Sequence, residues 1–128
     1  MNGPRRRIAW RLALVACLAL LAWAGWRGAA AQQADTRRDF EISARDHAFS
    51  PAVIEVQQDD LVRITMRAED IAHSFTLDEY RIAKRAAAGQ SVTFEFRADR
   101  AGTFPFYCDL KLDERCRNMR GQLVVRPR

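Results

Sequence analysis

The chain has 128 residues and carries 21 basic and 16 acidic residues, which gives a formal net charge of +5. Five of the basic residues lie within the first 31 positions, so residues 32–128 contain 16 residues of each sign. Because the excess positive charge is confined to the amino terminus, the composition argues against a nucleic-acid-binding surface. Residues 32–128 are long enough for one small domain with a modest core.

The first 31 residues have the pattern of an export signal. A basic segment at residues 4–7 precedes an uncharged apolar stretch at residues 12–26, and Ala29, Ala30 and Ala31 form an A-x-A cleavage site. We therefore expect residues 1–31 to be a signal peptide and the protein to be periplasmic or secreted. The apolar stretch is shorter than the about 20 residues of a membrane-spanning helix, so membrane contact is expected only if this leader stays uncleaved.

Short segments with a period of two begin after a polar segment. We expect residues 32–39 to be a flexible tail and residues 40–128 to form the folded domain. Alternating apolar and polar residues, which are typical of half-buried strands, occur at residues 40–43, 52–57, 61–68, 91–98, 103–108 and 122–126.

The alternation also predicts which side chains face the core. Within residues 61–68 we expect Val62, Ile64 and Met66 to point inward, and only residues 77–88 have room for a helical turn. Turn-forming residues separate the predicted strands. About seven short strands in one small domain predict an all-β fold, a Greek-key β-sandwich or barrel.

Four side chains are candidates for a metal site at one end of such a sandwich. His73 lies between two predicted strands, Cys108 ends another, and Cys116 and Met119 lie in the loop before the last strand. Thiolate and thioether sulfur together with imidazole favour copper or zinc over calcium or magnesium. The expected export of the protein makes copper the more natural candidate.

The same segments resemble a known family. Residues 49–77 are similar to the first half of a cupredoxin domain, and residues 99–108 with 119–125 are similar to the second half. The spacing most resembles the copper-A domain of cytochrome oxidase subunit II and nitrous oxide reductase. The resemblance implies a cupredoxin-like domain over residues 40–128.

Carried over by position, His73, Cys108 and Met119 match the copper ligands of that family, and Gly121 matches the glycine that restarts the last strand. Two positions depart from the family pattern. Leu112 stands in place of the second bridging cysteine, and Cys116 stands in place of the second histidine. A dinuclear centre needs both bridging thiolates and a histidine for each copper, so no copper-A centre is expected.

The resemblance instead implies a single copper ion bound by His73, Cys108, Cys116 and Met119. One nitrogen and three sulfur atoms form a soft ligand set, which favours Cu(I). The mixed charges of residues 109–118 and the missing loop histidine favour copper holding or delivery over electron transfer. In the case of electron transfer, the expected partner is a periplasmic redox protein or an oxidase.

A second interpretation stays open, because two cysteines in an exported domain commonly pair. A Cys108–Cys116 disulfide would give a metal-free cupredoxin fold that acts as an interaction module. His47 is interpreted as a packing or surface residue, with a substitute-ligand role as the less favoured alternative. No arrangement suited to hydrolysis and no phosphate-binding glycine loop is present, so the protein is not expected to be an enzyme.

Overall fold

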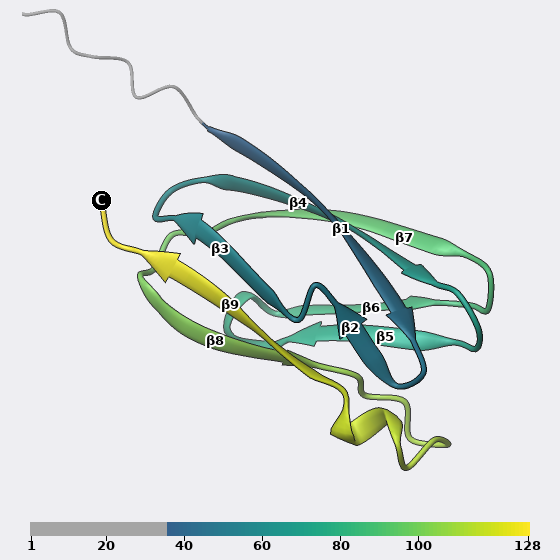
Figure 1. Cartoon of the computed structure of the whole chain (residues 1–128). Coiled ribbons are helices and arrows are strands. Elements are labelled where there is room, and N and C mark those ends of the chain that lie inside the picture. Colours follow the sequence, from purple (N-terminus) through teal and green to yellow (C-terminus); the bar gives the residue numbers. More distant parts are fainter. Residues whose placement is uncertain (1–35) are drawn as a thin grey trace, which may run out of the picture. The chain divides into compact units, whose positions relative to one another are not determined.

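The computed structural model describes residues 36–128 (Figure 1). The expected signal peptide and residues 32–35 of the expected tail lie outside the described residues. Within residues 36–128, no helix is long and apolar enough to cross a membrane. The described elements are β1 (Arg37–Arg45), β2 (Ala48–Ser50), β3 (Val53–Gln57), β4 (Leu61–Ala68), β5 (His73–Leu77), the 3₁₀ turn η1 (Asp78–Tyr80), β6 (Ile82–Ala86), β7 (Ser91–Arg97), β8 (Gly102–Tyr107), the 3₁₀ turn η2 (Cys116–Asn118) and β9 (Arg120–Arg126).

The strands form two sheets that enclose one core. One sheet has the order β2-β1-β4-β7, and the other has the order β3-β9-β8-β5-β6. β1 pairs with β4 and β3 pairs with β9 in parallel, whereas the other pairs are antiparallel. The predicted all-β sandwich is therefore confirmed. β2, β5 and β6 lie outside the segments that the sequence pattern identified as strands.

β4 shows why the alternating pattern was informative. Its residues Val62, Ile64 and Met66 are all fully buried, as predicted. The residues between them are exposed or half-buried. β4 lies between β1 and β7 in its sheet. Its alternating burial shows that one face packs on the core while the other faces solvent.

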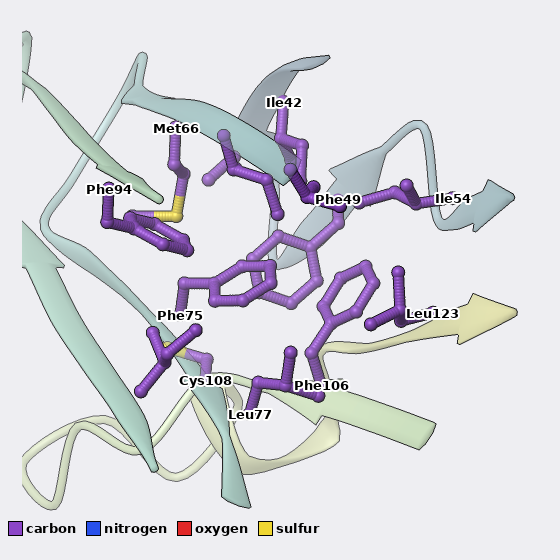
Figure 2. Close-up of a cluster of buried hydrophobic side chains, with 14 of the residues drawn as sticks. Ile42, Phe49, Ile54, Met66, Phe75, Leu77, Phe94, Phe106, Cys108 and Leu123 are labelled. Atoms are coloured by element: carbon purple, nitrogen blue, oxygen red, sulfur yellow. The ribbon is translucent and has the colours of Figure 1, made fainter. Parts of the chain in front are cut away.

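A cluster of aromatic rings joins the two sheets (Figure 2). The ring of Phe75 stacks on Phe106 with 4.6 Å between centroids, and both residues belong to the five-stranded sheet. Phe94 and Phe49 of the other sheet approach Phe75 with centroid distances of 5.1 Å and 6.1 Å. Burying each such side chain contributes about 1.5–3 kcal/mol relative to its exposed state. This cluster is therefore a main source of cohesion between the sheets.

The segment of residues 77–88 contains a helical turn, as expected, and also a strand that the sequence pattern did not indicate. Its helical content is the three-residue turn η1, and it is followed by β6. β5, just before it, is buried at every position. A strand that is covered on both faces lacks the polar alternation by which strands are identified, so the sequence pattern did not reveal it.

The start of the domain also differs from the prediction. β1 begins at Arg37, and residues 37–39 pair with residues 61–63 of β4. The guanidinium of Arg37 donates a hydrogen bond of 2.6 Å to Glu95 on β7, which lies on the other side of β4. Because these residues are held by backbone and side-chain hydrogen bonds, the expected tail is corrected for residues 37–39.

Gly121 allows a close contact between β9 and β8. It lies opposite Phe106 in the antiparallel pair. A Cβ atom at this position would lie 2.1 Å from Cζ of Phe106 and 2.7 Å from the carbonyl oxygen of Ala52. Only glycine fits here without displacing the ring, which explains the glycine at the second position of β9.

Candidate metal centre

The four predicted ligands are all buried in the described domain. His73 is the first residue of β5, and Cys108 directly follows β8. Cys116 begins η2, and Met119 separates η2 from β9. All four residues are at most 1 % exposed. The prediction had placed His73 in a loop, but the structure places it on a strand.

The two cysteines are joined by a disulfide. This bond closes the loop between β8 and β9, whose backbone is drawn in Figure 1. Both sulfur atoms also accept hydrogen bonds. The backbone N–H and the hydroxyl of Ser74 lie 3.4 Å and 3.6 Å from Sγ of Cys108. The backbone N–H of Leu110 donates to Sγ of Cys116 over 3.1 Å. Such donors stabilise negative charge on sulfur, so the surroundings of both sulfur atoms suit thiolates as well as a disulfide.

Ser74 connects β5 to the ligand loop, which is the segment of residues 108–119 between β8 and β9. Besides its contacts with Cys108, its hydroxyl oxygen accepts a hydrogen bond of 2.6 Å from the backbone N–H of Asp109. Sequence reasoning missed Ser74, although it directly follows a candidate ligand. Its position was not predictable, because the pairing of β5 with β8 is a contact between residues far apart in the sequence.

The imidazole of His73 has one nitrogen bonded and one free. Its Nε2 lies 2.7 Å from Oδ1 of Asp70. Its Nδ1 is buried and has no hydrogen-bond partner within residues 36–128. A carboxylate only accepts, so Nε2 carries a proton, and in the neutral form of the ring the lone pair lies on Nδ1. Metal-binding histidines are commonly held in this way, by a carboxylate on the second ring nitrogen.

Asp70 organises the neighbouring turns. The backbone N–H of Asp46, the ring of His73 and the backbone N–H of Ile71 all donate to its carboxylate. These hydrogen bonds, with that from Asp46 the largest contribution, hold the pKa of Asp70 well below its ordinary range. The carboxylate is therefore ionised and fixes the orientation of His73.

His47 and Asp113 form a second pair of this kind beside the site. Nε2 of His47 lies 2.6 Å from Oδ2 of Asp113, and this contact lowers the pKa of the Asp113 carboxyl. The carbonyl oxygen of Asp113 accepts a hydrogen bond from the backbone N–H of Cys116. Leu112, which stands where the family has a bridging cysteine, is fully exposed. The ligand loop is thus linked to the turn between β1 and β2.

In the disulfide form, the candidate ligands do not form a metal-binding group. Within residues 36–128, no three His, Cys, Asp or Glu side chains form a group that could hold a metal ion. The two sulfur atoms are bonded to each other in the disulfide, so neither is a thiolate that could bind a metal ion. The free Nδ1 of His73 and the thioether of Met119 are donors in either state, and reduction would add two thiolates.

The two-sheet sandwich, with a buried His, Cys and Met at one end, is the arrangement of a cupredoxin. The sequence model of the cupredoxin-like domain family matches residues 14–125. The chain belongs to this family, which confirms the resemblance seen in the sequence.

Solved structures show the same fold at low sequence identity. A chain of a heme-copper terminal oxidase dimer is 15% identical, with a TM-score of 0.65 over 94% of this chain and 99% of that chain. The "blue" copper protein auracyanin A from Chloroflexus aurantiacus is 18% identical, with a TM-score of 0.58 over 70% and 98%. The metal-binding domain of the Cu(I)-exporting ATPase CopA of Streptococcus pneumoniae, with Cu(I), is 18% identical, with a TM-score of 0.58 over 71% and 87%.

Proposed function

We propose that this cupredoxin binds a single copper ion in its reduced, dithiol form. The proposed ligands are Nδ1 of His73, the thiolates of Cys108 and Cys116, and the thioether of Met119. The observation that carries the proposal is the buried Nδ1 of His73, which has no partner among the described residues. A buried polar atom without a partner is costly, and a metal ion bound there would remove that cost.

The neighbouring residues are suited to prepare these ligands. The Asp70 carboxylate holds the proton on Nε2 of His73, so that Nδ1 keeps its lone pair. The N–H and O–H donors of Ser74 and the N–H of Leu110 favour the thiolate forms of the cysteines. Because both thiols must lose protons, we expect copper binding to weaken as the pH falls. Bound copper would supply a soft, redox-active centre.

Copper holding or delivery is the role we propose, ahead of electron transfer. The proposed thiolates favour Cu(I), and the loop offers mixed charge, including Lys111, Asp113 and Arg115. The likeness to a copper-exporting ATPase domain with Cu(I) and to a terminal oxidase chain is consistent with either role. We also propose that the protein acts outside the cytoplasm and without catalysis of its own, on the basis of its leader pattern and its single small domain.

The disulfide supports a second candidate function. A permanently closed Cys108–Cys116 bond would withhold both sulfur atoms and leave a metal-free interaction module. The two candidates differ in what happens after reduction, so one measurement separates them.

The deciding experiment quantifies copper and free thiols on one sample of periplasmic protein, before and after reduction and anaerobic addition of Cu(I). Under the copper proposal, one copper binds per chain, and both thiols resist alkylation only while it is bound. If the reduced protein takes up no copper, the site has lost its metal chemistry and the second candidate stands.

Replacing Cys116 tests the ligand assignment. Cys116→His restores a histidine at the family position, so we expect an intense visible absorption band with Cu(II), typical of a blue site. Cys116→Ser is the matched control, since it also breaks the disulfide but adds no imidazole. A histidine variant that stays colourless with Cu(II) would contradict the proposed geometry.

A further inference from the structure

The chain contains two histidines. In each of them, one ring nitrogen lies beside a carboxylate. Nε2 of His73 lies 2.7 Å from Asp70, and Nε2 of His47 lies 2.6 Å from Asp113. The two ring centroids are 5.8 Å apart, with the planes at 83°. Each imidazole therefore has one nitrogen fixed by a carboxylate, and the rings meet in the same part of the molecule.

His47 is held in place by its backbone as well as by its side chain. It lies on the tight turn between β1 and β2, where Asp46 and His47 have positive φ values of 52° and 58°. The N–H of Asp46 donates to Asp70, the same carboxylate that orients His73. The side chain of His47 is 14% exposed. The turn is thus fixed relative to the proposed metal site before any metal binds.

The chemistry of the ring follows from these contacts. The Asp113 carboxylate accepts a hydrogen bond, so Nε2 of His47 is the donor, and in the neutral form of the ring the lone pair lies on Nδ1. A carboxylate on the second nitrogen is the arrangement that fixes metal-binding histidines.

We propose that His47 is a second nitrogen ligand of the copper ion, with Nδ1 as its donor atom. This inference rests on the proposed function. It supplies from the turn between β1 and β2 the imidazole that is missing at position 116 of the ligand loop. The site then contains two imidazoles, as ordinary blue sites do, along with the sulfur ligands.

Nitrogen NMR of the imidazole rings tests this directly, because Cu(I) is diamagnetic and the chain has two histidines to assign. The reduced periplasmic protein is titrated anaerobically with Cu(I) while the Nδ1 resonances of both rings are followed. We expect both resonances to move to metal-bound positions at one equivalent. If the His73 resonance moves and the His47 resonance does not, His47 is not a ligand, and the proposed function is unaffected.

His47→Gln provides a second measurement. Its amide nitrogen can replace Nε2 as the donor to Asp113, but it has no equivalent of Nδ1. We expect the Cu(I) affinity, measured by competition with a chelator, to fall at least about 10-fold, the smallest loss typical when even an outer partner of a metal ligand is removed. His73→Gln is the matched control for losing a ligand, and thermal unfolding of the metal-free variants verifies folding.

The outcomes separate the two proposals. Wild-type affinity in His47→Gln, with a large loss in His73→Gln, overturns the inference alone. Failure of the reduced wild type to bind Cu(I) overturns the inference together with the proposed function.

Discussion

His73 shows how a single side chain can be prepared for one task. Its Nε2 is fixed by Asp70, and its buried Nδ1 has no partner within the described domain. The adjacent Ser74 directs an N–H and a hydroxyl toward Cys108. Two consecutive residues of β5 thus contribute to the site. His73 offers a ring nitrogen, and Ser74 donates hydrogen bonds to the sulfur of Cys108.

Asp70 leads to a prediction about pH. Its folded-state pKa is depressed below the ordinary 3.8, so its contribution to stability is complete above that pH and is lost as the pH falls toward the folded-state value. Asp70→Asn removes this contribution. We therefore expect the metal-free wild type to be more stable than Asp70→Asn at pH 6, and the difference to shrink at pH 3.

Urea unfolding of both proteins at the two pH values measures this difference. Asp113, whose pKa is lowered by His47, adds acid sensitivity of the same sign, but it is present in both proteins. A stability difference that stays constant from pH 6 to pH 3 would show that the Asp70 carboxylate does not stabilise the fold through its charge.

At the scale of an element, the loop between β8 and β9 carries three of the four proposed ligands. It contains η2 and is closed by the disulfide across a sequence separation of 8 residues. Its other ties are hydrogen bonds to Ser74 and to His47. The loop is thus positioned by residues from β5 and from the turn between β1 and β2.

Cys116→Ser measures the contribution of this closure. For a loop of this length, the chain-entropy model predicts a loss of about 2–3 kcal/mol in the free energy of unfolding. A thiol reductant should lower the melting temperature of the metal-free wild type toward that of the variant and leave the variant unchanged. If the reductant shifts neither protein, the two cysteines are not paired in solution.

At the scale of the molecule, the aromatic cluster links both sheets at the centre of the sandwich. Phe75 contacts one ring from its own sheet and two from the other. Its strand, β5, also carries His73 at its first position. The packing of the core therefore fixes the position of the strand that supplies the nitrogen ligand.

Phe75→Ala should cost about 3–5 kcal/mol in the free energy of unfolding, because it leaves a cavity between the sheets. This is a large part of the about 5–15 kcal/mol that stabilises a typical domain. Phe104→Ala is the control, since Phe104 is half-buried at the edge of the core and should cost less. Urea unfolding compares the two, and Phe75→Leu replaces the alanine variant if that does not fold. An equal loss at both positions would show that Phe75 does not link the sheets.

The sequence by itself determined the fold class, the family and the inward face of β4. Val62, Ile64 and Met66 could be assigned to the core because a strand with one solvated face alternates strictly. His73, Cys108 and Met119 could also be recognised as candidate ligands, because the family pattern is defined by spacing along the sequence.

Only the tertiary structure decided where β5 lies and which residues surround the ligands. β5 is buried on both faces, so it has no alternating pattern. The pair His47–Asp113 and the donors of Ser74 to Cys108 join loops and strands that meet only in the folded chain. A hydrogen bond between residues 34 or 66 positions apart leaves no local trace in the sequence, because it depends on the packing that brings distant elements together.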